Sequence, residues 1–89
     1  MIDGYTEAGR IYHCEIKTKH LHAFGQERQV DPDVWHDGLY NIPAVDYWGR
    51  PDSMSEQWAI DLQNELIELG YPAEDIRIHL EIHYERNRP

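Results

Sequence analysis

Cysteine is almost absent from this sequence, and no long apolar run is present. The single cysteine, Cys14, excludes an intramolecular disulfide and a zinc site made of several cysteines. This usage is typical of proteins in a reducing cytosol. No apolar stretch approaches the length needed to cross a membrane, and the N-terminus has no basic-then-apolar signal pattern. We therefore expect a cytoplasmic protein.

Basic residues are scarce in the middle of the chain. Between Arg28 and Arg77 the sequence has eleven carboxylates and one basic residue, Arg50, and this segment accounts for the net charge of −9. A surface of this sign repels the phosphates of nucleic acid and attracts basic protein surfaces. Clustered acids also improve solubility, so the charge by itself has both a functional and a purely physical explanation.

Phenylalanine is rare as well, with one residue against nine tryptophans and tyrosines. Aromatic rings that carry a polar group suit half-buried positions and interfaces better than a dry core. The chain has 89 residues, of which 40% are hydrophobic. This is enough apolar material for one small folded domain that spans residues 1–89.

The clearest helix signal lies between residues 54 and 69. Ser53 and Glu56 have the spacing of a capping box, and Gly70 marks the end of the helix. Ile60 and Ile67 widen the apolar arc of this helix, so we consider them candidates for contact with a second copy of the chain. The 3.6-residue period predicts a core-facing stripe that consists of Trp58, Ala59, Leu62, Leu66 and Leu69.

Two segments have the alternating period of strands. Residues 76–84 alternate between apolar and polar side chains, which predicts a half-buried strand with one face in solvent. Residues 10–24 predict a second strand in which Tyr12, Cys14 and Ile16 face inward, with a break after residue 17. Residues 25–30 then turn back to complete a hairpin.

The middle of the chain has no regular period. Asp31 followed by Pro32 predicts a short helical turn that reaches Gly38. Residues 39–51 then form a long loop rich in aromatic residues, a type of loop that is usually functional or packed upon itself. Together these segments predict an α+β fold. It would have a small antiparallel sheet of about three strands, one main helix packed on one face, and a long aromatic loop.

Histidines supply the candidate metal ligands. His20 and His22 flank one apolar residue, so both imidazoles would project from the same face of a strand. The segment 20–24, His-Leu-His-Ala-Phe, resembles the metal-binding triplet of HUH endonucleases, which start rolling-circle replication and transposition. The resemblance implies a metal-dependent nuclease with a nucleophilic tyrosine. No tyrosine after His22 falls on the predicted helix, and the acidic middle does not suit a DNA groove.

A second group of candidate ligands lies on the C-terminal strand. His79, Glu81 and His83 share its polar face, and an antiparallel N-terminal strand would add His13 and Glu15. Alternate strand positions are roughly 7 Å apart, too far for neighbours to share one metal without another strand. Cross-strand polar pairing on a solvated face is the simpler interpretation.

We expect the main functional surface in the aromatic and acidic middle. Aromatic anchors ringed by carboxylates suit docking onto a basic protein, because the rings supply buried area and the acids supply steering. Alternatively, these rings only cover the open side of the sheet. The predicted partner-binding residues are Asp31, Asp33, Trp35, Asp37, Tyr40, Asp46, Tyr47, Trp48, Asp61, Glu65 and Glu68.

The sequence thus predicts a non-enzymatic binding protein that needs no metal or cofactor. Its partner would be a basic, nucleic-acid-handling protein, which it would inhibit, and its spaced acids could mimic a nucleic-acid backbone. Small acidic chains of this kind resemble phage or mobile-element inhibitors of host defence. Two alternatives remain open: a metal-dependent or HUH-like protein that uses the histidines, and a structural subunit that associates through Ile60 and Ile67.

Overall fold

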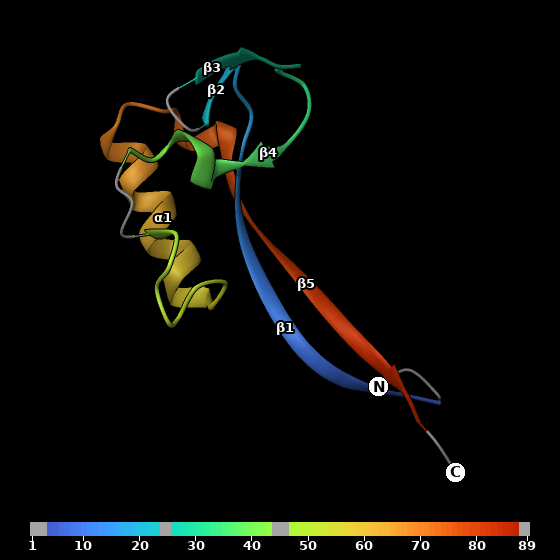
Figure 1. Cartoon of the computed structure of the whole chain (residues 1–89). Helices are drawn as coiled ribbons and strands as arrows, with labels where there is room; N and C mark the ends of the chain where they lie inside the picture. The colour runs from blue at the N-terminus through green and yellow to red at the C-terminus, as the bar shows by residue number, and fades with distance from the viewer. Residues whose placement is uncertain (1–3, 24–25, 44–46, 88–89) are drawn as a thin grey trace.

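The fold is α+β, with one helix and five strands in two small antiparallel sheets (Figure 1). It is taken from a computed structural model that describes residues 4–23, 26–43 and 47–87. The first sheet has the strand order β4-β1-β5, and the second consists of β2 and β3. The strands are β1 (Tyr5–Ile16), β2 (His20–Ala23), β3 (Gln26–Gln29), β4 (His36–Asp37) and β5 (Ile76–Arg86). The helical elements with described bounds are α1 (Glu56–Glu68) and the 3₁₀ turns η1 (Gly38–Asn41) and η3 (Ala73–Asp75).

The two longest strands, β1 and β5, form an antiparallel ribbon that extends well beyond the body of the molecule (Figure 1). The register pairs Ile16 with Ile76 and Tyr12 with Leu80, and it shifts at a bulge between Glu7 and Gly9. α1 covers only the end of β1 and the start of β5, and the rest of the ribbon projects from the body. The molecule therefore measures 50 × 29 × 23 Å. The predicted C-terminal strand is therefore confirmed, whereas the N-terminal strand begins at Tyr5 rather than residue 10.

The predicted break and hairpin are confirmed, but the predicted helical turn is not. The chain leaves β1 after Ile16 and returns as the β2–β3 hairpin, in which residues 23 and 26 are paired. The Asp31 carboxylate accepts a hydrogen bond from the backbone N–H of Asp33, which closes a local turn instead of starting a helix. Strand β4 follows and pairs with β1 through residues 36 and 37.

The main helix is confirmed, with a correction to its start. Its N-cap is Ser55, whose hydroxyl accepts a hydrogen bond from the backbone N–H of Trp58 at 3.1 Å. The predicted capping box of Ser53 and Glu56 was therefore wrong. The helix ends as predicted: Gly70 has a φ of 103°, and the backbone N–H of Tyr71 bonds to the carbonyl of Leu66. This is a Schellman motif, in which a residue in the left-handed conformation lets the following backbone N–H groups bond to the last carbonyls of the helix.

The core lies between α1 and the covered part of the β1–β5 ribbon. Its buried apolar residues are Cys14, Ile16, Ile42, Trp58, Ala59, Leu62, Leu66 and Ile76. Gly38 also lies in this core, and an added Cβ there would be 2.8 Å from Leu66 Cδ1 and 3.2 Å from the Cys14 carbonyl oxygen. Leu69 was expected in the core but is 45% exposed, because it is the C-cap residue that follows the last turn of α1.

None of the helices in the described part of the chain is long and apolar enough to span a membrane.

Candidate protein-binding surface

The acidic face of α1 meets the aromatic loop at Tyr47. The Trp58 indole N–H, from the buried side of the helix, donates a hydrogen bond to the Tyr47 carbonyl at 3.2 Å and fixes the loop against α1. Burial raises the pKa of the Tyr47 phenol, and the carboxylates of Glu65 and Asp61 raise it further. The ring is therefore close enough to these carboxylates to feel their charge.

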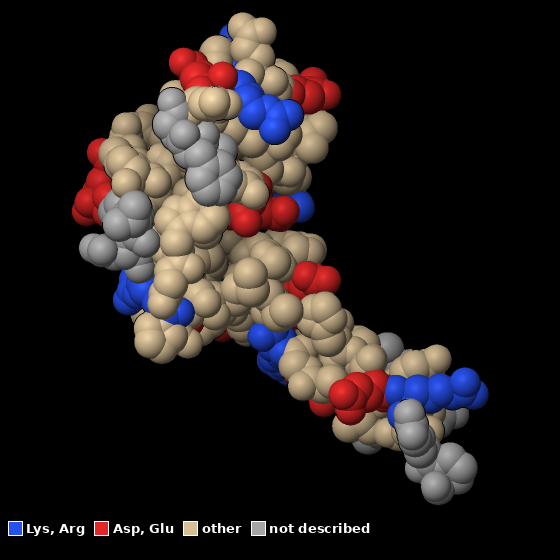
Figure 2. Space-filling view, viewed as in Figure 1, with Lys and Arg blue, Asp and Glu red and all other residues tan. Residues whose placement is uncertain are grey.

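The acidic face itself consists of Asp61, Glu65 and Glu68 on successive turns of α1. Figure 2 shows acidic side chains along the outer side of the body, where α1 runs. Arg50 is the basic residue that reaches this face: its guanidinium lies 3.9 Å from the Asp61 carboxylate and over the Tyr47 ring at 5.4 Å. One arginine against three carboxylates leaves the face negative.

Two further loop aromatics lie next to each other. The rings of Tyr40, on η1, and Trp48 have centroids 5.7 Å apart and planes tilted by 54°. Trp48 is 45% exposed despite this contact. Trp48 directly follows Tyr47 in the chain, and its ring contacts Tyr40 of η1. Aromatic rings that are half covered and half exposed provide apolar area for a partner.

The rest of the predicted surface lies elsewhere. Trp35 stacks with the charged ends of Arg77 and Lys17, at 4.5 and 5.0 Å from the ring centroid. Asp37 pairs with Glu15 on β1 and shares its face of the sheet, which is the face opposite α1. Asp31 and Asp33 belong to the exposed turn before β4. The structure therefore divides the predicted residues between two faces, and Asp46 lies outside the described residues.

The face of the sheet opposite α1 carries the histidine and glutamate row of β5. The register places His13 opposite His79 with their rings stacked at 6.3 Å, and His13 lies 3.0 Å from the Glu81 carboxylate. This hydrogen bond lowers the pKa of Glu81. Arg77 forms an ion pair with Glu15 at 2.8 Å. The expected cross-strand pairing of β1 and β5 is thus confirmed, and these groups contact one another in pairs.

The two histidines of the β2 triplet differ in their surroundings. His20 Nδ1 lies 2.9 Å from the Glu27 carboxylate of β3. His22 instead lines a pocket at the end of α1, and its backbone N–H donates a hydrogen bond to Asn41. Within the described residues, no group of three or more His, Cys, Asp or Glu side chains is arranged to hold a metal ion.

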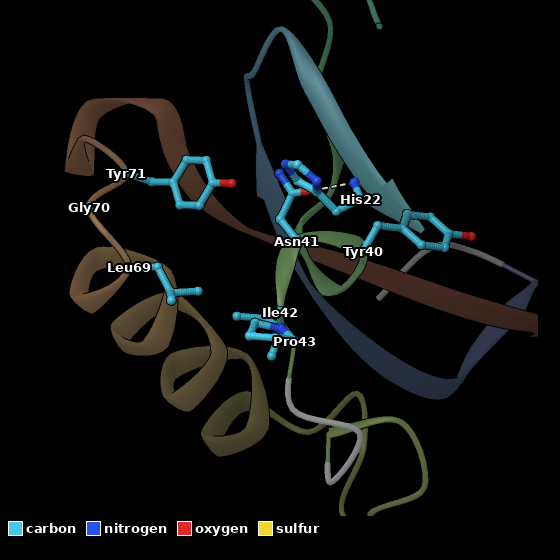
Figure 3. A pocket seen from close by; sticks show the side chains of 8 residues that line it. All are labelled: His22, Tyr40, Asn41, Ile42, Pro43, Leu69, Gly70 and Tyr71. Carbon is cyan, nitrogen blue, oxygen red and sulfur yellow. Dashed lines mark hydrogen bonds between the residues drawn. The ribbon is translucent and has the colours of Figure 1, made fainter. Parts of the chain in front are cut away.

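That pocket was not expected from the sequence. It has a volume of about 470 Å³ and opens between β2, η1 and the C-terminal end of α1 (Figure 3). Tyr71 points across it toward Asn41 and His22, while Leu69 and Ile42 supply apolar walls. The only sequence signal was Leu69 itself, a large apolar residue in the last turn before the Gly70 stop.

Asn41 holds the inner end of the pocket together. It is 5% exposed, its side-chain oxygen accepts the N–H of His22 at 3.0 Å, and its amide donates to the His20 carbonyl at 3.3 Å. A buried amide that is satisfied on both sides fixes β2 against η1. Cys14, by contrast, lies deep in the core, and burial raises the pKa of its thiol to about 12, so it is not poised as a nucleophile.

In comparisons with known proteins, no family model, curated protein or solved structure matches this chain.

Proposed function

We propose that this chain is a small acidic protein-binding domain that docks onto a basic surface of another protein. The observation that carries the proposal is the position of the Tyr47 ring beside the carboxylates of α1. Tyr47 is fixed by Trp58 beside Asp61 and Glu65, and the exposed Trp48 follows directly in the chain. Rings that bury area next to charges that steer encounter are the two parts that such an interface needs.

The spacing of the carboxylates supports a partner that handles nucleic acid. Asp61, Glu65 and Glu68 lie four and three residues apart, so they form a row along one side of the helix with roughly 4.5–6 Å of axial rise between neighbours. A basic groove that binds a phosphate backbone recognises a row of regularly spaced negative charges. We infer that the acidic face occupies such a groove and inhibits its owner, in the cytoplasm of the cell where both are made.

Charge reversal on this face tests the proposal. Changing Asp61, Glu65 and Glu68 to lysine alters the charge by two units at each position. The fold should survive, because none of the three side chains is buried: Glu68 is exposed, and Asp61 and Glu65 are partly exposed. Wild-type chain and variant would be used to capture proteins from a host lysate over a salt gradient. The captured partner's association rate would then be measured, and we expect the reversal to lower it most at low salt.

A matched control separates this face from net charge. Glu27, Asp33 and Glu74 are all exposed and lie away from α1, and their change to lysine alters the total charge by the same amount. The proposal requires that the control variant still bind the partner and still displace nucleic acid from it. If both variants bind as the wild type does, the acidic face of α1 is not the docking surface.

A further inference from the structure

The outer edge of β5 is a long strand edge with no partner among the described residues. β5 lies at one side of the β4-β1-β5 sheet, and no backbone hydrogen bond joins its outer edge to another described segment. The outer edge of β1 differs, because the N–H of Tyr12 donates to the Met54 carbonyl and residues 15 and 16 pair with β4. β5 also lacks the bulges, prolines and lysines that usually protect an edge strand.

The register shows which backbone groups of β5 are unpaired. The N–H of Tyr12 points away from β5, so the opposite residue, Leu80, also directs its N–H and C=O outward. β5 has no bulge of its own, so the same holds for Ile78, Ile82 and Tyr84. A second strand can therefore bond to this edge only through the backbone N–H and C=O groups of the even-numbered residues of β5.

The side chains at this free edge are also incompletely covered. Leu80 is 37% exposed, Tyr84 is 42% exposed, and Ile82 is half-buried. They lie on the part of the ribbon that extends past α1. Figure 2 shows this projecting arm, with acidic and basic side chains close together near its end. The tip is held together, because Thr6 bonds to the Asn87 side chain and the Asn87 N–H donates to the Gly4 carbonyl.

We propose that two copies of the chain pair through β5, antiparallel, around a two-fold axis at Ile82. In this register the polar face places His79 opposite Glu85 and Glu81 opposite His83 of the second copy. Every carboxylate on this part of β5 therefore meets an imidazole, which has an N–H donor in either protonation state. On the other face Leu80 opposes Tyr84, and Ile82 opposes its own copy.

Neighbouring registers fit less well. An axis at Glu81 would place two Glu81 carboxylates directly opposite each other, which destabilises a strand pair. An axis at Leu80 would leave His83 opposite Arg77 and would bring the two bodies closer together. With the axis at Ile82, Ile78 lies four residues away, roughly 13 Å along the strand. This distance keeps the helical parts of the two copies apart. The strands of both copies then form one continuous six-stranded sheet with the order β4-β1-β5-β5-β1-β4.

The first test measures oligomeric state. Sedimentation over a hundredfold range of concentration should show wild-type chain approaching twice its 10.6 kDa mass. Ile82→Pro should remain a monomer at every concentration. Its fold should be intact by circular dichroism, because the lost N–H points away from β1 and proline is tolerated at such edge positions. Ile82→Lys serves as a second variant that keeps the N–H and places a charge at the axis. A wild-type chain that stays monomeric overturns the proposal.

The second test measures the register. In a bonded pair the two Ile82 Cα atoms would be roughly 5.5 Å apart, within the range of a disulfide. Ile82→Cys should therefore cross-link two copies under mild oxidation, while Leu80→Cys should not, because its own copy lies four residues away along the strand. The native Cys14 is 1% exposed and does not interfere. Equal cross-linking of both variants overturns the register.

A control distinguishes this interface from one on the helix. Ile67 is 43% exposed on α1 and was, together with Ile60, the sequence-based candidate for contact between copies. Ile67→Ser should leave the dimer unchanged if β5 forms the interface. A dimer that Ile67→Ser dissociates and Ile82→Pro does not would show that the helix, and not the β5 edge, joins the copies. Neither result depends on the basic partner proposed for the acidic face.

Discussion

Leu66→Ala should lower the free energy of unfolding by roughly 3–4 kcal/mol. Leu66 is 0% exposed and contacts the chain where Gly38 passes beneath the helix. The change removes three buried carbons, which is worth roughly 2.4 kcal/mol at about 0.8 kcal/mol each. A cavity term adds to this, because the backbone of Gly38 and Cys14 cannot close the space, and buried leucine-to-alanine changes cost about 2–5 kcal/mol in total.

The loss is large compared with the stability of so small a protein. A chain of 89 residues is expected to have about 4–13 kcal/mol in total. Urea unfolding followed by circular dichroism would measure the change. Since 1 kcal/mol corresponds to about 4–8 °C for a domain of this size, the melting temperature should fall by more than about 10 °C.

Leu69→Ala is the matched control. Periodicity alone places Leu69 on the same apolar stripe as Leu66, but Leu69 is 45% exposed at the rim of the pocket. Its replacement should cost less than about 1 kcal/mol, because little apolar area leaves the interior. Similar losses for the two variants would refute the orientation of α1 described above, as would a Leu66→Ala variant that melts within a degree or two of the wild type.

Three further predictions follow from single contacts. Gly38→Ala should cost roughly 1–3 kcal/mol by overpacking, since the new Cβ would lie 2.8 Å from Leu66 Cδ1, and urea unfolding would measure this cost. Ser55→Ala should cost about 1 kcal/mol through loss of the N-cap, whereas Ser53→Ala should change the unfolding midpoint very little. Cys14 should resist thiol reagents at pH 8 until the chain unfolds. Because burial raises the thiol pKa to about 12, its contribution to stability is complete below the ordinary thiol pKa and is lost as the pH rises toward 12. Stability should therefore fall more steeply above pH 9 in the wild type than in Cys14→Ala, and equal slopes would contradict this.

Local sequence patterns alone determined the two best-defined elements, α1 and β5. The period of the apolar residues and the Gly70 stop depend on contacts within a few residues, so they can be read without the fold. The inward positions Tyr12, Cys14 and Ile16 followed from the same rule. The N-cap of α1 could not be predicted in this way, because Ser53 and Ser55 have the same side-chain chemistry. In the structure Met54 has a φ of 68° and its carbonyl accepts the N–H of Tyr12, so the chain becomes helical only after Ser55.

The tertiary structure decided which predicted surface residues share a face. Trp35 and Tyr40 are five residues apart, and composition alone groups them, but strand β4 lies between them and places Trp35 on the side opposite α1. The pocket joins β2, η1 and the end of α1, segments far apart in the chain, so no local pattern could predict it. The length of the ribbon that extends beyond α1 is likewise determined by the tertiary structure. The alternation of β5 continues through Tyr84, but only the placement of one helix determines where its apolar face is left uncovered.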